Sequence, residues 1–260
     1  MTIITDFRPE VKRIEHLFES RLTPTIEVIE NFPQVITEKP QTTDMVNAAA
    51  NSLRSPLLAL KIYLDLLKNF PQEEKKTDVL LRMKNTTDEM SKKINALARL
   101  VDIQTDVQIT EEVNFEDLLE QVKTELKKSF DLKDITFTTN FIEPSFQANT
   151  SELSLLLFQI LHNAITYRQD NQPLHITLKT KKVGSYFLIG IKDNGQGMQL
   201  KNDDEAEKLF RPFYRLNDET NGIGIGLSIV RSIVDKYQGE IKVKSRVNQG
   251  SMFNIYLKSQ

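Results

Sequence analysis

The chain has 260 residues, enough for one large domain or two ordinary ones, and 39% of them are hydrophobic, which suffices for a packed core. A net charge of −2 and the absence of cysteine exclude disulfides, thiolate metal sites and the basic field that is typical of nucleic-acid-binding proteins. The longest strongly apolar run, residues 153–161, is shorter than the roughly 20 residues of a membrane span, and the N-terminus does not read as a signal peptide. These features predict a soluble, cytoplasmic protein without a membrane segment.

The first 44 residues predict an N-terminal helical segment and a linker. A helical pattern covers about residues 9–31, interrupted by Pro24, and His16 is expected on its surface. Residues 32–44 are rich in proline and polar residues, which is typical of a connection.

Residues 45–106 predict an antiparallel helical hairpin that breaks at Pro71. Each helix carries apolar residues at alternating spacings of three and four, the a/d rule of helical bundles. The seams comprise positions 53, 57, 60, 64 and 67 on the first helix and 80, 83, 87, 90, 94, 97 and 101 on the second. Because an isolated pair buries such seams poorly, we expect a dimer that forms a four-helix bundle. The alternative is that the hairpin packs on the rest of its own chain.

Residues 107–260 predict a two-layer α/β sandwich. The pattern reads helix, strand, helix, two strands, loop, helix, two strands. The long apolar helix begins at Ser151, the last helix stops at Gly239, and the closing hairpin turns at Gly250. Strands that pair mostly with their neighbours, and helices that need one sheet face, favour this architecture.

A glycine-rich loop, "NGIGIGLS", directly precedes the last helix. Gly222, Gly224 and Gly226 allow close backbone approach, and bare N–H groups at a helix start bind phosphate. No Lys-Ser/Thr follows as in a Walker A loop, and Leu227 stands where the dinucleotide fingerprint has its third glycine. Taken alone, such glycines also make turns.

Two polar residues are candidates for nucleotide recognition. Asp193 ends a strand in "DNGQGM", and a carboxylate there accepts a hydrogen bond from the amino group of adenine, which guanine lacks at that position. The alternative is an Asx-turn that caps the strand. Asn163, on the long helix, offers an amide oxygen suited to Mg²⁺, or is an ordinary surface residue.

Together these segments resemble a known family. Asn163, "DNGQG", "LFRPFYRL" and "GIGIGL" resemble, in this order, the N, G1, F and G2 boxes of the catalytic ATP-binding domain of sensor histidine kinases. That domain belongs to a superfamily shared with gyrase and heat-shock chaperones. The likeness covers about residues 45–260.

The resemblance implies ATP and Mg²⁺ as cofactors and assigns roles by position. Asn163 would bind Mg²⁺, Asp193 would read adenine, and residues 198–221 would form a mobile lid. The remaining implied contacts are Gly195 and Gly197 at the base, Tyr167 on the nucleotide, Arg215 at a phosphate, and Gly222, Gly224, Gly226 and Leu227 around the phosphates.

The N box departs from the family in ways that bear on phosphate affinity rather than on adenine recognition. Gln159 stands where asparagine is common, and Thr166 where lysine is frequent. Arg168 is a candidate substitute for that lysine from a different helical angle.

The segment "NSLRSPL", residues 51–57, resembles the family's phosphoacceptor motif of His, acid, Leu, Arg, Ser/Thr, Pro, Leu. Pro56 would then be the family's helix bend. Asn51 replaces the histidine, and an amide nitrogen is not a useful nucleophile. Ser52 replaces the acidic base and cannot accept a proton at pH 7. Ser55 matches a position that helps a partner receiver domain lose its phosphate, or it serves in capping.

The other histidines are not expected to replace the acceptor. His162 is expected to pack in the core or behind the site, and His175 to lie on a strand face or surface.

We therefore expect an α+β protein: a dimeric antiparallel helical hairpin, then a sandwich of the histidine-kinase/gyrase/chaperone ATP-binding type. It would bind Mg-ATP, pair as a homodimer or with a related kinase, contact a response regulator receiver domain, and be impaired in autophosphorylation. The alternatives are an active kinase with a substituted acceptor, a kinase that phosphorylates its partner in trans, and an ATP-ordered binding or phosphatase module.

Overall fold

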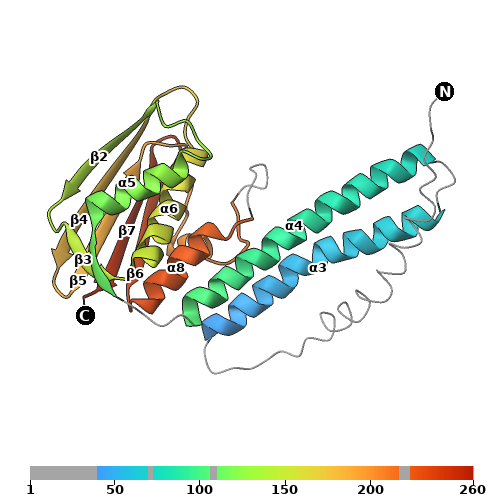
Figure 1. Ribbon diagram of the computed structural model, residues 1–260, viewed down its shortest axis with the longest axis horizontal. Coiled ribbons are helices and arrows are strands. Elements are labelled where there is room, and N and C mark those ends of the chain that lie inside the picture. The colour runs from blue at the N-terminus through green and yellow to red at the C-terminus, as the bar shows by residue number, and fades with distance from the viewer. Residues whose placement is uncertain (1–39, 70–72, 106–109, 217–222, 260) are drawn as a thin grey trace. The chain divides into compact units, whose positions relative to one another are not determined.

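A computed structural model of the chain describes residues 40–69, 73–105, 110–216 and 223–259. The predicted helix over residues 9–31, with His16, lies outside these residues. The described residues form two compact units, which divide between Asn95 and Ala96 (Figure 1). None of the helices in the described ranges combines the length and hydropathy that crossing a bilayer requires.

The first unit is a pair of long helices, α3 (Pro40–Asn69) and the greater part of α4 (Glu73–Thr105). Because α3 begins at Pro40, residues 40–44 are helical and not part of a linker as the sequence predicted. Proline suits a helix start, since the N–H that it lacks would have no partner inside the helix there.

The two helices share an apolar core. The buried residues are Leu60, Leu67, Val79 and Met83, against which Tyr63, Leu64, Leu80 and Met90 pack. The seam predicted on α3 is confirmed at Leu60, Leu64 and Leu67. On α4 the predicted Leu80, Met83 and Met90 lie in this core, Val79, which the prediction left out, is buried there as well, and Ile94 is 51% exposed in the single chain. A strict alternation of three and four repeats every 3.5 residues, whereas a straight helix has 3.6 residues per turn. Along a long helix, a residue next to a predicted seam position can therefore lie in the seam instead.

The second unit is a two-layer sandwich, as predicted. One layer is a five-stranded sheet in the order β2-β4-β5-β7-β6. Its strands are β2 (Ile135–Phe141), β4 (Leu174–Val183), β5 (Tyr186–Asp193), β6 (Glu240–Arg246) and β7 (Gly250–Lys258). The other layer is formed by α5 (Phe115–Leu126), α6 (Thr150–Thr166) and α8 (Gly226–Lys236), which lie on one face of the sheet (Figure 1). The core lies between the two layers.

The strand pairing is partly local. The hairpins β4–β5 and β6–β7 are antiparallel, as predicted, whereas β2 pairs in parallel with β4, and β5 pairs with β7. Three short elements were missed: β1 (Glu111–Asn114), which pairs with β3 (Ser145–Ala148), and α7 (Asp203–Lys208). Elements of four to six residues are too short to show a hydrophobic period.

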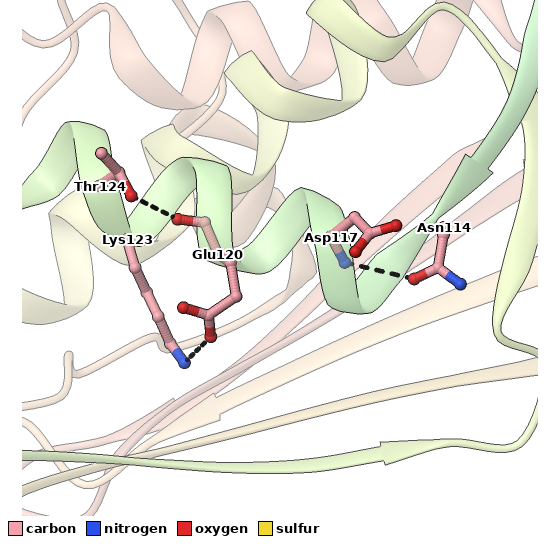
Figure 2. Close-up of polar contacts among 5 residues, drawn as sticks. All are labelled: Asn114, Asp117, Glu120, Lys123 and Thr124. Atoms are coloured by element: carbon pink, nitrogen blue, oxygen red, sulfur yellow. Dashed lines mark hydrogen bonds and ion pairs between the residues drawn. The ribbon is translucent and has the colours of Figure 1, made fainter.

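Helix α5 shows how local chemistry sets a helix start. The Asn114 side-chain oxygen accepts hydrogen bonds from the backbone N–H groups of Glu116 and Asp117, at 2.9 and 3.2 Å. Figure 2 shows the bond from Asp117 to Asn114 together with the pair between Lys123 Nζ and Glu120, whose atoms lie 2.7 Å apart. Asn149 and Asn202 cap α6 and α7 in the same way. An asparagine cap satisfies N–H groups that have no partner inside the helix.

A buried ion pair joins α6 to α8. Lys236 Nζ, in the last turn of α8, lies 2.5 Å from Glu152 Oε1, in the first turn of α6. Both side chains are largely buried, with 14% and 9% exposed. Among the described residues, Glu152 Oε2 has no hydrogen-bond partner. The positive charge of Lys236 therefore provides most of the stabilisation of this buried carboxylate.

We expect Lys236→Met to lower the free energy of unfolding by about 3–5 kcal/mol, because it leaves a buried carboxylate without its cation. The measurement is urea denaturation at neutral pH. Lys242→Met is the control, since Lys242 pairs with Glu240 at 3.2 Å on the surface. It should cost at most about 1 kcal/mol. Equal losses in the two variants would contradict the expectation.

Candidate functional site

The candidate site begins with Asp193, the last residue of β5. Its carboxylate is buried, and Oδ1 accepts hydrogen bonds from the backbone N–H groups of Gly195 at 2.8 Å and Ser251 at 3.2 Å. Burial raises the pKa of Asp193, while these two N–H groups oppose the rise. The side chain is thus a buried acceptor held in one orientation. The Gly195 contact is also the Asx-turn that the sequence allowed as an alternative.

The glycines after Asp193 permit close contact between backbones. A Cβ atom on Gly195 would lie 2.7 Å from the carbonyl oxygen of Tyr167. A Cβ atom on Gly197, whose φ is +65°, would lie 1.9 Å from the carbonyl oxygen of Arg246. Only glycine fits both positions, so this segment is wedged between the end of α6 and the end of β6.

A second group of polar atoms lies at the start of α8. Gln159 and Asn163 are one turn apart on α6 and both face Gly226. A Cβ atom on Gly226 would lie 2.7 Å from Gln159 Oε1 and 4.0 Å from Asn163 Oδ1. The structure therefore brings the altered N-box position, the predicted Mg²⁺ ligand and the glycine-rich loop together.

The start of α8 differs from the starts of α5, α6 and α7. Its N-cap residue is Ile225, and no described side chain caps it, whereas asparagines cap α5, α6 and α7. Its first turn contains no acidic residue, and Leu227, half-buried, is its second residue. Helix N–H groups suit phosphate oxygens, and a nearby amide oxygen suits Mg²⁺, so the groups present fit a magnesium-bound phosphate.

The predicted lid contacts the glycine-rich loop. Phe213, whose φ is +65°, donates its N–H to the carbonyl oxygen of Gly224 at 2.8 Å. A Cβ atom on Gly224, whose φ is +75°, would lie 3.0 Å from Arg215 Cγ. Arg215 thus lies against the loop that the resemblance assigns to the phosphates. The lid is described only up to residue 216, and Gly222 lies outside the described residues.

Sequence reasoning missed several residues that hold the Asp193 segment. Gln169, Ser245, Asn248 and Ser251 hydrogen-bond to it or to the residues just after it. Three of these four belong to β6, β7 and the turn between them, about 50 residues further along the chain. Since no local motif relates them to Asp193, the sequence carries no signal for this contact.

The phosphoacceptor-like segment lies in the continuous helix α3. Asn51 is exposed, and its Oδ1 accepts from Arg54 Nη1 at 3.4 Å. Ser52 Oγ donates to the carbonyl oxygen of Ala49 at 2.8 Å. Ser55 is exposed and Pro56 is buried. Positions 51 and 52 therefore present an amide and a hydroxyl in place of an imidazole nucleophile and a carboxylate base.

The two histidines that the structure describes, His162 and His175, lie on α6 and β4 and not on the phosphoacceptor-like helix. His162 is half-buried and contacts the rings of Phe130 and Phe158, and burial lowers its pKa. The packing role predicted for His162 is therefore confirmed. His175 is exposed on β4.

Comparison with known proteins gives one family match. Residues 148–260 match the family described as histidine kinase-, DNA gyrase B-, and HSP90-like ATPase. The matched range contains Asn163, Asp193 and the glycine-rich loop.

Relatives extend the similarity to the hairpin. The chain is 23% identical over 222 residues to the alginate biosynthesis sensor protein KinB of Pseudomonas aeruginosa, covering 83% of this chain and 36% of that protein. It is 26% identical over 220 residues to sporulation kinase C of Bacillus subtilis, covering 83% and 49%. The chain thus spans less than half the length of these curated relatives.

Solved structures share the fold. Acinetobacter baumannii histidine kinase AdeS has a TM-score of 0.56 at 20% identity, covering 81% of this chain and 98% of that one. Histidine kinase ThkA in complex with response regulator TrrA has a TM-score of 0.58 at 17% identity, covering 95% and 66%. Together, these comparisons show that residues 148–260 form a histidine kinase-, DNA gyrase B- and HSP90-like ATPase domain and that the chain is similar to sensor histidine kinases over about four fifths of its length.

Proposed function

We propose that this chain is the transmitter part of a two-component signalling protein that binds Mg-ATP, dimerises and does not phosphorylate itself at position 51. The observation that carries the nucleotide part is the pairing of a buried acceptor, Asp193, with an uncapped helix start at α8. One group suits the amino edge of adenine, and the other suits phosphates.

We propose the following roles for the residues around these two groups. Asp193 accepts a hydrogen bond from adenine, and the close-packed Gly195 and Gly197 leave room for the base. Asn163 holds Mg²⁺, and the N–H groups from Gly224 to Leu227 receive the phosphates. Gly222 belongs to the same loop by sequence, Tyr167 packs on the nucleotide, and Arg215 reaches a phosphate.

Exposed apolar residues on the hairpin support dimerisation. Leu58, Ile62 and Leu66 follow one another at four-residue intervals on α3, and they are 48%, 57% and 37% exposed. Residues at this spacing share one helix face. On α4, Leu81 and Ile94 are 57% and 51% exposed. A second copy of the hairpin would cover these side chains in a four-helix bundle.

We expect Ile62→Glu to weaken dimerisation by about 100-fold or more, because the charge would lie unpaired in the interface. The molar mass from light scattering across a dilution series measures this. Lys61→Glu, a larger change of charge at the neighbouring exposed position, should leave the dimer intact. A monomeric unmodified protein, or a dimer that tolerates Ile62→Glu, would contradict this interface.

The signalling output is binding rather than phosphoryl transfer from this chain. ThkA is described in complex with a response regulator, and we extend to this chain the inference that it binds a receiver domain. Asn51 and Ser52 support the lack of self-phosphorylation, since neither supplies an imidazole or a carboxylate. Exposed Ser55 favours one further candidate, a phosphatase activity toward the receiver domain through an oriented water.

The test is incubation with γ-labelled ATP beside a melting experiment with Mg-ADP. We expect a melting temperature that rises with Mg-ADP, because a ligand that binds only the native state stabilises it, and no label on the chain. Acid-labile, base-stable label would overturn the proposed lack of autophosphorylation. A melting temperature that does not change when Mg-ADP is added would overturn the proposed nucleotide binding.

A further inference from the structure

One side-chain amide ties its own loop to two other backbone segments beside the candidate base pocket. Gln169 lies in the loop between α6 and β4. Its Nε2 donates to the carbonyl oxygens of Asn194 at 3.0 Å, Gly195 at 2.8 Å and Asn248 at 3.2 Å. Asn194 and Gly195 directly follow Asp193, and Asn248 lies in the turn between β6 and β7.

Backbone hydrogen bonds link the same segments. Gln196 N donates to the carbonyl oxygen of Tyr167 at 2.9 Å, and Asn248 N donates to the carbonyl oxygen of Gln196 at 2.6 Å. Both the N–H and the carbonyl group of Gln196 are therefore hydrogen-bonded. Gln169 binds the carbonyl of the residue before it, Gly195, and the carbonyl of its partner Asn248. We call this arrangement the Gln169 clamp.

The clamp acts on the groups that orient Asp193. The Asp193 carboxylate accepts from the N–H groups of Gly195 and Ser251. Gly195 belongs to one segment that Gln169 binds, and Ser251 lies three residues beyond Asn248 in the other. A shift of either segment would move a donor away from the carboxylate.

The chemistry of the three acceptors explains why an amide is needed. Three carbonyl oxygens converge on one point, and their partial negative charges repel unless a donor lies between them. The NH₂ group of glutamine carries two hydrogens and no negative charge, so it bridges them. A glutamate of the same length would add a negative charge and supply no donor at neutral pH.

We propose that Gln169 is a positioning residue that sets the geometry of the base pocket by holding the segments on both sides of Asp193. This inference rests on the proposed nucleotide binding. It adds that adenine recognition depends on a residue that need not touch the nucleotide.

Calorimetric titration of the full chain with Mg-ADP and Mg-GDP tests the clamp. We expect Gln169→Ala to weaken Mg-ADP binding about tenfold, because two or three hydrogen bonds that preorganise the pocket are lost, and Gln169→Glu to weaken it more. Gln172→Ala is the matched control. Gln172 lies in the same loop, and its Nε2 donates to the carbonyl oxygen of Asn194 at 3.1 Å, but it does not bridge to the turn before β7. It should change affinity by no more than about twofold.

Two further readouts separate positioning from general stability. The preference for Mg-ADP over Mg-GDP should fall in Gln169→Ala, while the melting temperature without nucleotide changes little. In addition, the pH at which Mg-ADP affinity halves should move upward, since the Gly195 N–H group that favours the ionised carboxylate is loosened.

The outcomes distinguish the two claims. An unmodified protein that binds no Mg-ADP defeats the proposed function itself. An unmodified protein that binds Mg-ADP, with Gln169→Glu binding equally well or with Gln172→Ala equally weakened, defeats the clamp alone. A fall in affinity that only parallels a fall in melting temperature also defeats it.

Discussion

Asn51→His combined with Ser52→Glu should take up label from γ-labelled ATP at a rate at least about 100-fold above the unmodified chain, because the pair restores a nucleophile and its base. The unmodified chain should show only background. Histidine supplies a ring nitrogen with a free lone pair near neutral pH, and glutamate accepts the proton from the other ring nitrogen. Asn51→His alone should fall between the two, since it lacks the base.

Position 51 is suited to this test. Asn51 is exposed on α3, and its described contact is the long one with Arg54, so a histidine there should not disturb packing. The label should be stable to base and labile to acid, as a phosphoramidate is. The control is the same double variant carrying Asp193→Asn, which should take up label far more slowly at low ATP concentration because it holds the nucleotide about 100-fold more weakly.

Two outcomes would overturn this account. Label on the unmodified chain would mean that another residue accepts the phosphoryl group. Alternatively, a double variant that binds Mg-ADP and dimerises but takes no label would mean that the hairpin cannot present position 51 to the nucleotide.

Asp193→Asn should weaken Mg-ADP binding by about 100-fold, because hydrogen bonds to a charged, desolvated acceptor rank among the strongest in a pocket. The amide oxygen can still accept from Gly195 and Ser251, so the local backbone should hold. The amide nitrogen, however, would then face the adenine amino group, donor against donor. Titration calorimetry at neutral pH measures the loss.

Unlike nucleotide affinity, the folding stability of Asp193→Asn should not fall. Burial raises the pKa of Asp193 above its ordinary value of 3.8, so the folded protein holds this proton more tightly than the unfolded chain does. The ionised carboxylate therefore lowers stability at neutral pH, and this loss disappears as the pH falls through the raised pKa. We expect Asp193→Asn to unfold at the same urea concentration as the unmodified protein, or higher, at neutral pH.

The pH profile of binding provides a second check. Mg-ADP affinity of the unmodified protein should decline as the pH falls through the raised pKa, because the protonated carboxyl no longer accepts from adenine. The residual affinity of Asp193→Asn should stay flat across that range. A wild-type profile that is equally flat would contradict the role of the carboxylate.

The sequence by itself predicted a helical hairpin followed by a sandwich, and it supplied the residues that we propose for the site. Pro71 and the leucine spacing of α3 indicate a hairpin, and alternation indicates the β4–β5 and β6–β7 hairpins. Each of these signals lies within one element and its turn, where periodicity and turn chemistry act. Asp193 and the glycine-rich loop were recognised for the same reason, since each motif is a short run on one element.

Only the tertiary structure decided how those motifs meet. That Gln159 and Asn163 face Gly226, and that Gln169 and Ser251 hold the Asp193 segment, depends on contacts between residues 26 to 79 positions apart in the sequence. Such contacts leave no period in the sequence, because the packing of whole layers creates them.

The same reason explains the errors in the predicted elements. Strands β1 and β3 are each four residues long, and their pairing comes from contact with each other rather than from alternation. On α4, Val79 is buried although the spacing did not include it, because the facing helix also selects which side chains lie in the seam. Local sequence patterns thus predict the helices, the strands and the residue types of the site, whereas the packing of these elements against one another determines the shape of the pocket.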